Sequence, residues 1–287
     1  MIIDGTATAS QIHQELASRL KALLPRQPRL VAVLVGDNPA SHLYVASKVR
    51  ACHKIGMASD KLLLPASTSQ ESLLKTIDDL NNDPSITGIL VQLPLPAHID
   101  PLTIAKQIRP EKDVDGASPI NYGKLLMGDL TGFIPCTPLG IQVLLMRHGI
   151  ETEGRHVVIA GRSNIVGKPL ASLMMQKGKG ANATVTVVHS QTPDIASFSR
   201  QADILVAAIG KAQYFTADMV KDGVVVIDVG QNRIDDATSP KGYKLVGDVD
   251  YESVKTKCSW ITPVPGGVGP MTIAMLLSNT LKAFEND

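Results

Sequence analysis

The segment Val157–Pro169, with the sequence VVIAGRSNIVGKP, limits the choice of fold more than any other part of the chain. Its first four residues are apolar and mostly β-branched, which is typical of a buried strand in a parallel sheet. Gly161 and Gly167 then enclose a turn, and Pro169 stands where a helix can begin without losing a hydrogen bond. A strand, a glycine turn and a helix start together form a site where helix amides and the helix dipole bind phosphate.

Two known phosphate-binding loops can be compared with this turn. A nucleotide-hydrolysing P-loop has four residues between its glycines and then Lys and Ser or Thr. Here five residues intervene and Pro169 follows Lys168, so that loop is excluded. The dinucleotide fingerprint G-x-G-x-x-G fits only loosely, because Ser163 replaces its second glycine and Gly167 comes one residue late. From the turn alone, an ordinary strand–turn–helix corner remains the alternative.

The next predicted strand favours NADP over NAD as the ligand of this turn. It covers Thr184–Val188 and ends in the polar residues His189–Thr192. NAD-binding units carry an Asp or Glu there, roughly 20 residues after the glycines, which accepts hydrogen bonds from the ribose hydroxyls. A carboxylate would repel a 2′-phosphate, so its absence and the presence of Arg162 in the turn both favour NADP. The alternative for Arg162 is an ordinary surface arginine.

Length and composition narrow the class of protein. The 287 residues suffice for one large or two ordinary domains, and 44% hydrophobic residues can build a sizeable core. A net charge of +1 without a long basic run argues against a nucleic-acid surface. We expect a cytosolic protein, because neither a bilayer-spanning apolar stretch nor a signal-peptide pattern is found. The three cysteines are far apart and the seven histidines are scattered, so we expect neither a disulfide framework nor a metal site.

Strands and helices are predicted to alternate along most of the chain. The expected strands are 30–35, 61–64, 88–93, 157–160, 184–188, 204–209, 224–229 and 259–261. The expected helices are 8–24, 41–56, 69–81, a segment from 101 to before 110, 138–148, a segment within 194–201, 217–220 and 271–284. Thr8 with Gln11, Asp100 and Gly56 are the expected helix caps. This alternation predicts an α/β fold with mostly parallel sheets, whose second half is a Rossmann-type unit.

Residues 111–137 interrupt the alternation and are rich in Gly, Pro, Asp and Asn. An ordered loop of this length in a compact domain is usually functional. Asp113 and Asp115 lie two residues apart in it, which suggests a metal site, acid–base work or recognition of N–H donors. Since no histidine or further carboxylate accompanies them, metal binding is the least favoured of these three functions. The alternative without any function is a plain Asp-Gly turn at 115–116.

Three further features could carry chemistry. Tyr44 and Lys48 are four residues apart, so they share one helix face, and a lysine desolvated in a cleft can act in acid–base catalysis. Gln92 ends a buried strand and needs a hydrogen-bond partner, either internal or a ligand. The glycines of the segment 266–270 allow close approach of a ligand or form a hinge into the last helix. For the Tyr–Lys pair, the alternative is a solvated lysine beside a half-buried tyrosine.

Taken together, these segments resemble the bifunctional methylenetetrahydrofolate dehydrogenase/cyclohydrolase family, the FolD type. The matching motifs run in order along nearly the whole chain. One departure is Ala212, which follows Lys211 where the family usually has proline, and it concerns local loop geometry only. The motifs are YVxxK at 44–48, GILVQLPLP at 88–96, PxKDVDG at 110–116, PCTP at 135–138, GRSxIVGxP at 161–169, HSxT at 189–192, VIDVG at 226–230, GDV at 247–249 and PVPGGVGPMT at 263–272.

The resemblance implies an NADP-dependent enzyme of one-carbon metabolism. Hydride would pass from 5,10-methylenetetrahydrofolate to NADP⁺, and the methenyl product would be hydrolysed to 10-formyltetrahydrofolate, which is used in purine biosynthesis. It further implies two α/β domains with the substrate in a cleft between them. The expected domains are 1–140, completed by a returning segment 270–287, and the NADP-binding domain 141–269. The family is typically a homodimer joined through its cofactor domains.

The resemblance also assigns roles to individual residues. Lys48 would be the key catalytic group, oriented by Gln92 and flanked by Tyr44, and Asp115 would accept N–H bonds from the pterin. Arg162 and Ser190 would hold the 2′-phosphate, and the turn from Ser163 to Gly167 the pyrophosphate. The predicted cofactor residues are Gly161, Arg162, Ser163, Ile165, Val166, Gly167, Ser190, Thr192 and Gly230. The predicted folate contacts are Tyr44, Lys48, Gln92, Asp115, Pro265, Gly266, Gly267, Val268 and Thr272.

Two other functions stay open at this point. A relative that keeps the dehydrogenase and lacks the hydrolytic step is disfavoured, since Lys48, Gln92 and Asp115 are all present. The other is a non-catalytic regulator that binds NADP or folate. It is disfavoured because such a protein would not need the complete set of Tyr44, Lys48, Gln92 and Asp115.

Overall fold

The computed structural model describes residues 1–239 and 242–286. They form two compact units, which we call the first unit (Gln11–Cys136 and Ile273–Asp287) and the second unit (Met1–Ser10 and Thr137–Thr272). Asp287, at the end of the returning segment expected at 270–287, lies outside the described residues. In the part of the chain that the structure describes, no helix combines the length and the apolar character needed to cross a membrane.

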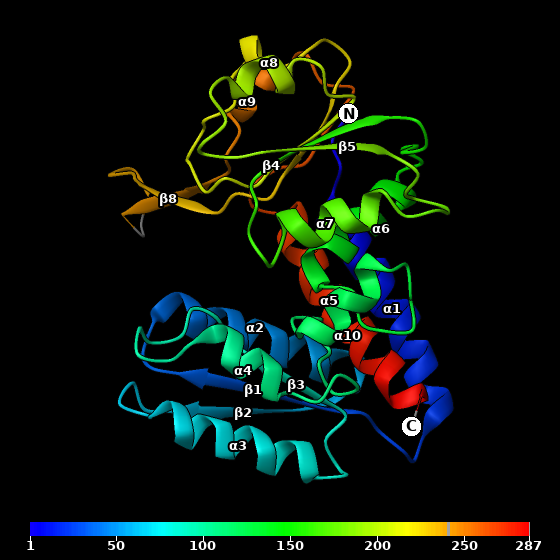
Figure 1. Ribbon diagram of the computed structural model, residues 1–287, viewed down its shortest axis with the longest axis vertical. Helices are drawn as coiled ribbons and strands as arrows, with labels where there is room; N and C mark the ends of the chain where they lie inside the picture. The colour runs from blue at the N-terminus through cyan, green and yellow to red at the C-terminus, as the bar shows by residue number, and fades with distance from the viewer. Residues whose placement is uncertain (240–241, 287) are drawn as a thin grey trace. The chain divides into compact units, whose positions relative to one another are not determined.

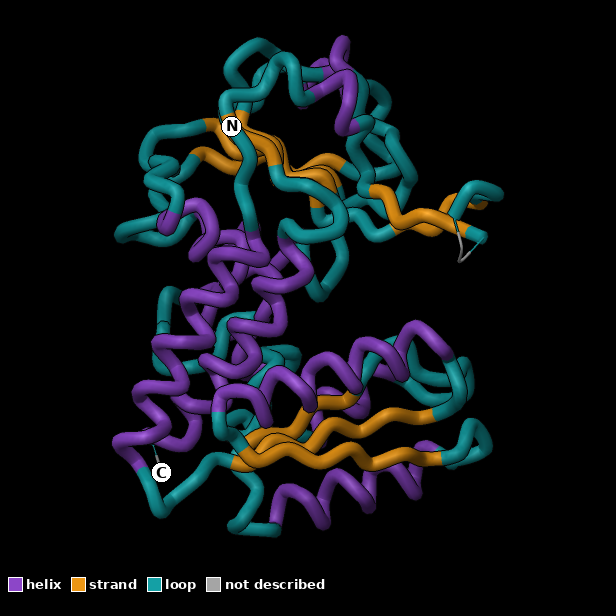
Figure 2. The backbone as a smooth tube through the Cα atoms, turned by 180° about the vertical axis from the view of Figure 1, so that it is seen from behind, coloured by secondary structure: helices purple, strands orange, loops and turns teal. Residues whose placement is uncertain are grey.

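The first unit is built on a parallel sheet of three strands in the order β2-β1-β3. Helix α2 lies on one side of this sheet and helix α3 on the other, as Figures 1 and 2 show. Alternate residues of β1, among them Val31 and Val33, pack with Leu73 and Ile77 of α3 in one apolar cluster. The elements are β1 (Arg29–Val35), β2 (Ala58–Leu64), β3 (Gly88–Val91), α2 (Pro39–Ile55), α3 (Gln70–Asn82), α4 (Pro101–Gln107) and α5 (Pro119–Leu126).

The second unit contains a parallel sheet of five strands in the order β10-β7-β6-β4-β5. The chain runs from β4 to β5 on one side and then returns to β6 on the other, so a topological switch point lies between β4 and β6. The sheet strands are β4 (His156–Ala160), β5 (Thr184–Val188), β6 (Ile204–Ala207), β7 (Val225–Asp228) and β10 (Trp260–Ile261). The other elements are α6 (Cys136–Arg147), α7 (Gly167–Met174), α8 (Ile195–Ser199), the 3₁₀ turn η1 (Ala217–Met219), the hairpin β8 (Asn232–Asp235) and β9 (Tyr243–Val246), and α9 (Tyr251–Val254).

Helices α1 (Gly5–Leu23) and α10 (Val268–Glu285) each contribute residues to both units. The first six residues of the chain follow β10 and the loop after it: the Ile3 amide donates to the Ile261 carbonyl at 2.8 Å, and the Thr6 amide to the Gly266 carbonyl at 3.0 Å. These bonds explain why residues 1–10 join the second unit in the structure, whereas the sequence-based division groups them with 11–140.

The predicted parallel α/β arrangement is confirmed, and several boundaries differ. Helix α1 begins before Thr8, and its cap is Asp4, whose Oδ1 accepts from the Ala7 amide at 2.9 Å. The expected Thr8–Gln11 capping box is therefore wrong. Pro169 is the third residue of α7, because that helix already begins at Gly167. The expected caps Asp100 and Gly56 are confirmed, the latter with φ of 87°.

Helix α5, the short helix α9 and the hairpin of β8 and β9 have no counterpart among the elements expected from the sequence. Helix α5 lies within residues 111–137, where the many Gly, Pro and Asp residues suggested only loop. Its start is nevertheless marked by Ser118, whose Oγ accepts from the Asn121 amide at 3.2 Å, and by Pro119 in the first turn. The hairpin of β8 and β9 is likewise not expected from the sequence, since each of its strands has only four residues and none of them is buried.

Candidate functional site

A lysine–glutamine pair stands at the carboxyl edge of the first unit's sheet. Lys48, on α2, is only 7% exposed, and its Nζ donates to Oε1 of Gln92 at 3.0 Å. Gln92 follows β3 directly, and its own amide nitrogen Nε2 donates to the Leu93 carbonyl at 2.6 Å. Both the side-chain oxygen and the side-chain nitrogen of Gln92 are therefore engaged, which fixes the oxygen toward the ammonium group. The structure thus brings together two of the residues singled out in the sequence.

The fold supplies the reason for this pairing. The strand order β2-β1-β3 makes the chain cross from one side of β1 to the other, so a switch point lies between β1 and β3. Ligands of open α/β sheets bind outside the carboxyl ends of the strands at such a point. Helix α2 follows β1 after the turn at Gly36, and Asn38 caps it by accepting from the Ala40 and Ser41 amides. Tyr44 lies one helical turn before Lys48 and is 36% exposed.

Asp115 belongs to the same neighbourhood as Lys48. The buried Cys136 thiol has a pKa well above its usual value, first because of burial and next because of the charge of Asp115, while the charge of Lys48 acts in the opposite direction. Both charged groups are therefore close enough to act on one sulfur atom. Burial, helped by the charges of Asp115 and Asp113, also raises the pKa of Tyr122. Sequence reasoning did not single out Cys136 or Tyr122, although Cys136 stands inside the quoted PCTP motif.

Asp113 has a structural role in this loop. It is 1% exposed, and its carboxylate accepts from the Ala117 amide at 3.0 Å, the Ser118 amide at 2.7 Å and Nδ2 of Asn121 at 2.8 Å. Burial raises the pKa of Asp113 to about 6, against these hydrogen bonds, which favour the charged form. The two aspartates therefore differ: Asp113 holds the start of α5, and the half-buried Asp115 remains the candidate for a ligand contact.

In the second unit, the glycine turn is packed too closely for any side chain at its two ends. Gly161 has φ of 131°, and a Cβ there would lie 2.1 Å from the Ala208 carbonyl oxygen. A Cβ on Gly167 would lie 2.1 Å from the Gly161 carbonyl oxygen. Ser163, which replaces the usual middle glycine, closes the turn by accepting from the Val166 amide at 3.2 Å. The glycines therefore let the end of β4 meet the end of β6 and the start of α7.

A pocket of about 220 Å³ opens beside this turn. It lies at the carboxyl ends of β4, β5 and β6, which is the switch point of the sheet. Arg162 and Ser190, the two residues predicted to hold the 2′-phosphate, both line it. Its lining residues, none of them acidic, are Gly161, Arg162, Ser163, His189, Ser190, Ile195, Ala208, Ile209, Lys211 and Tyr214.

Other predicted cofactor residues lie around the pocket without lining it. Ile165, Val166 and Gly167 continue the turn into α7, with Ile165 52% exposed. The Thr192 hydroxyl accepts from the His189 amide at 3.0 Å, so its observed role is to shape the turn after β5. Gly230 lies after β7, and a Cβ on it would lie 2.3 Å from the Asp248 backbone nitrogen.

Two buried aspartates hold the loops around this edge of the sheet. Asp228 accepts from the amides of Gly230, Asp248 and Val249 at 2.9–3.0 Å. Asp248 in turn accepts from the Ile209 amide at 2.7 Å and the Gly210 amide at 2.8 Å. Burial raises the pKa of Asp228 to about 7. Both residues lie in motifs quoted from the sequence, but their partners are loops that only the folded chain brings together.

The segment predicted to contact folate from the second unit is partly helical. Residues Pro265–Gly267 form a loop, and Val268 already begins α10. A Cβ on Gly267 would lie 2.6 Å from the Pro263 carbonyl oxygen, so this loop is also closely packed. The Thr272 hydroxyl is hydrogen-bonded to that of Thr137 at 3.0 Å. The expectation of a final helix beginning only at 271 is therefore wrong by about one turn.

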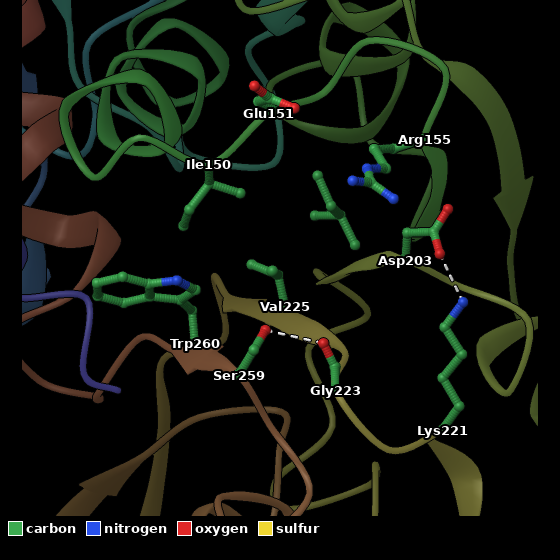
Figure 3. Close-up of a pocket in the computed structure, with 10 residues that line it drawn as sticks. Ile150, Glu151, Arg155, Asp203, Lys221, Gly223, Val225, Ser259 and Trp260 are labelled. Carbon is green, nitrogen blue, oxygen red and sulfur yellow. Dashed lines mark hydrogen bonds and ion pairs between the residues drawn. The ribbon is translucent and has the colours of Figure 1, made fainter.

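A further pocket of the second unit lies at the opposite edge of its sheet, where β4, β6, β7 and β10 begin (Figure 3). The Lys221 ammonium is paired with the Asp203 carboxylate at 2.6 Å, and the Ser259 hydroxyl donates to the Gly223 carbonyl at 2.8 Å. This pocket lies at the amino ends of the strands and so is not the cofactor site expected of such a sheet. Among residues 1–239 and 242–286, no group of three or more His, Cys, Asp or Glu side chains could hold a metal ion.

Comparisons with known proteins identify the family of the chain. The tetrahydrofolate dehydrogenase/cyclohydrolase catalytic-domain model matches residues 3–115, and the NAD(P)-binding-domain model of the same family matches residues 135–287. The chain is 56% identical over 290 residues to the bifunctional protein FolD of Chloroherpeton thalassium, covering 100% of this chain and 99% of the relative.

Solved structures agree as well. The bifunctional FolD enzyme of Campylobacter jejuni is 48% identical, with a TM-score of 0.94 and coverage of 100% of this chain and 99% of that one. The Trypanosoma brucei FolD structure, solved with NADP cofactor and inhibitor, is 40% identical with a TM-score of 0.94, covering 100% of this chain and 97% of the other. With both family domains matched along almost its whole length, the chain belongs to the bifunctional tetrahydrofolate dehydrogenase/cyclohydrolase family, the FolD family.

Proposed function

We propose that Lys48, held by Gln92 and flanked by Tyr44, carries the proton transfer of this enzyme, and that Asp115 orients the folate substrate. The observation that carries the proposal is the 3.0 Å hydrogen bond from the Lys48 ammonium to Gln92 Oε1 at a switch point of the sheet. A 7% exposed lysine is restricted in its motion, so its Nζ is available at a defined position.

The reactions themselves follow from the family. The chain is an NADP-dependent methylenetetrahydrofolate dehydrogenase and methenyltetrahydrofolate cyclohydrolase. It oxidises 5,10-methylenetetrahydrofolate to the 5,10-methenyl cation and hydrolyses that cation to 10-formyltetrahydrofolate. When bound, NADP⁺ supplies the acceptor for the hydride that leaves the methylene carbon.

The oxidation makes a modest demand on the side chains. The positive charge formed at the carbon is shared by the two nitrogen atoms beside it, so no strong base is required. The protein contributes mainly by orienting the reacting groups. In this proposal Asp115 accepts N–H bonds from the pterin ring, and such charge-assisted hydrogen bonds fix the orientation of the ring.

The hydrolysis needs protons to move, and this is the role proposed for Lys48. The oxygen of water bonds to the methenyl carbon and releases one proton. The bond from that carbon to N5 then breaks as N5 gains a proton, and the same oxygen gives its second proton to the solvent as the formyl C=O forms. An amine that takes up and returns a proton balances both steps. Gln92 keeps Nζ in place through its Oε1 atom, and Tyr44, one turn away on α2, would flank the substrate.

The pocket beside the glycine turn fits the cofactor. A 2′-phosphate needs cationic and hydroxyl donors and no carboxylate, and Arg162 and Ser190 line the pocket without an acidic neighbour. In the proposal these two residues hold the 2′-phosphate, and the turn from Ser163 to Gly167 at the start of α7 holds the pyrophosphate. Gly161, Thr192 and Gly230 would shape the surrounding loops. Pro265, Gly266, Gly267, Val268 and Thr272 are proposed to contact folate near the nicotinamide.

One assay tests this proposal. Purified protein is mixed with methylenetetrahydrofolate and NADP⁺, and the absorbance of the methenyl product is followed as it forms and decays. We expect NADP⁺-dependent formation and a decay faster than in buffer. Methenyl that decays only at the buffer rate would contradict the role of Lys48 and favour a monofunctional dehydrogenase. Binding of NADP⁺ without turnover would favour a regulator.

We further propose that two copies of the chain pair through their second units, as the family resemblance implies, and that the product serves purine synthesis in the cytoplasm. Light scattering on the eluting protein measures the mass directly. A mass of one chain, 30.6 kDa, across the working concentration range would contradict the dimer.

A further inference from the structure

The imidazole of His189 has a defined orientation at the end of β5. Its Nδ1 accepts a hydrogen bond from the Gln191 amide at 3.2 Å. An Nδ1 atom that accepts a hydrogen bond carries no proton, so the neutral ring carries its proton on Nε2. The backbone on either side is held as well, because the His189 amide donates to the Thr192 hydroxyl at 3.0 Å and the Thr192 amide to the His189 carbonyl at 2.7 Å.

With its proton on Nε2, the ring faces another donor. Nη1 of Arg162 lies 3.4 Å from Nε2 of His189, and a guanidinium group has donors only. Two N–H groups that face each other do not satisfy each other, whereas an anionic oxygen placed against both would accept from each. Both residues line the pocket beside the glycine turn.

The remaining charges around the ring have the same sign. Lys211, from the segment after β6, also lines the pocket, with its Nζ 5.3 Å from the ring centre of Tyr214. The lining of this pocket contains no Asp or Glu that could pair with the three basic residues. An ion with several acceptor oxygens and about two negative charges suits such a set, and a ribose 2′-phosphate has this chemistry.

We propose that His189 is a third ligand of the 2′-phosphate, donating from Nε2 beside Arg162 and Ser190, and that it contributes to the choice of NADP over NAD. This inference rests on the cofactor site proposed above and adds a specificity-determining residue to it. The competing explanation is that His189 only shapes the turn, through its Nδ1 bond to Gln191 and its backbone bonds to Thr192.

Two substitutions separate these explanations, because each keeps one end of the imidazole. In His189→Asn the amide oxygen can replace Nδ1 as acceptor for the Gln191 amide, and nothing replaces Nε2. In His189→Gln the longer side chain can place its amide N–H near the position of Nε2, and the acceptor near the backbone is lost. Affinities for NADP⁺ and for NAD⁺ are measured by titration calorimetry on the full chain, so the result does not depend on turnover.

We expect His189→Asn to weaken NADP⁺ binding about tenfold or more, the usual effect of losing a hydrogen bond to a charged group, while NAD⁺ binding changes less than twofold. His189→Gln should retain NADP⁺ affinity within about threefold, since its amide can still donate. If His189 only shapes the turn, His189→Asn binds both cofactors like the wild type and His189→Gln weakens both alike. That pattern would overturn the inference.

Two further variants make the outcome unambiguous. His156→Asn removes a histidine at the start of β4 that bonds to Thr186 and Gln201, and it should leave the ratio of the two affinities unchanged. Arg162→Ala should lower the NADP⁺ affinity relative to NAD⁺. An unchanged ratio in Arg162→Ala would contradict the proposed cofactor site itself, whereas a lowered ratio with a normal His189→Asn would contradict only the role of His189.

Discussion

At the scale of single residues, the proposed catalytic residues of the first unit and the proposed cofactor residues of the second unit differ in how their polar groups are satisfied. Lys48 has its acceptor within the protein, at Oε1 of Gln92, so its position is set before any substrate arrives. Arg162 and His189 present donors to each other. The first arrangement suits a group that must move a proton at a fixed place, and the second suits a group that must hold an anion.

Replacing Lys48 should separate the two activities. In Lys48→Met the aliphatic part of the side chain is kept and the amine is lost, so we expect the hydrolysis rate to fall by about 10²–10⁴, the usual share of a general acid–base group. NADP⁺ binding should be unchanged, because the proposed cofactor residues belong to the other unit. The decay of added methenyltetrahydrofolate measures the loss, and circular dichroism checks the fold. Wild-type decay in this variant would rule out the assigned role.

At the scale of elements, close backbone packing positions the glycine turn that we propose binds the cofactor. The end of β4, the segment after β6 and the start of α7 meet at Gly161 and Gly167, where a Cβ would lie 2.1 Å from a carbonyl oxygen. In the other unit, helix α10 plays a similar part through Asn279. Its Nδ2 donates to the Val114 carbonyl at 2.9 Å and to the Ile134 carbonyl at 3.1 Å, on either side of the loop that carries Asp115.

A single methyl group at Gly161 should therefore disrupt the cofactor site. Gly161→Ala forces an unfavourable φ, which alone costs about 1–3 kcal/mol, and it collides with the Ala208 carbonyl. We expect a lower midpoint in urea unfolding and a large loss of NADP⁺ affinity by calorimetry. The matched control is Gly123→Ala, in the exposed face of α5, where no atom lies within 4 Å of the added Cβ. That variant should be as stable as the wild type or slightly more stable.

Removing the Asn279 amide should loosen the Asp115 loop. Asn279→Leu removes this donor from both carbonyls, so the Val114 carbonyl keeps only the weak Cys136 thiol donor and the Ile134 carbonyl loses its side-chain partner. A buried group left unsatisfied costs about 1–3 kcal/mol. We expect lower stability together with a higher KM for the folate substrate. Thr280→Val is the control on the same helix, because the Thr280 hydroxyl donates only within α10, to the Leu276 carbonyl. Equal effects of the two substitutions on KM would show that Asn279 has no special role in the loop.

At the scale of the whole molecule, buried carboxyl groups link stability to pH. The pKa of Asp228 is raised from 3.8 to about 7, mainly by burial, and that of Asp113 to about 6. A group with a raised pKa in the folded state stabilises the fold while it is protonated. Its contribution is complete below its unfolded-state pKa of about 4 and is lost as the pH rises through its folded-state value.

We therefore expect the Asp228 contribution to unfolding free energy to fall between about pH 4 and pH 7, by roughly 4 kcal/mol. Urea unfolding of the wild type and of Asp228→Asn gives the unfolding free energy of each at several pH values. The Asp228 contribution is the difference between the two proteins in how this free energy changes with pH. Should the variant fold poorly, the side-chain carbon signal of Asp228 can be titrated by NMR in the wild type. A midpoint near pH 4 in that titration would contradict the prediction.

Local signals in the sequence suffice to predict most of the helices and strands of this protein and the kind of ligand that its glycine turn favours. Apolar runs of strand length, the caps Asp100 and Gly56, and the glycine turn after Ala160 depend on neighbours within a few residues, so they can be read in order along the chain. Helix α5 and the hairpin of β8 and β9 were not predicted, because α5 is a short helix in a segment rich in Gly, Pro and Asp and the hairpin strands have four residues each, none of them buried.

Only the tertiary structure decided which polar groups are partners. Lys48 and Gln92 are 44 residues apart, and Asp248 reaches the Ile209 amide from 39 residues away. The spacing of these residues in the sequence predicts neither hydrogen bond, because both depend on the order of the strands and on loops that meet at the edge of a sheet. The same holds for Asp113 and Asp115, which look alike in the sequence, because the fold buries one among backbone amides and leaves the other half-buried as the candidate ligand contact.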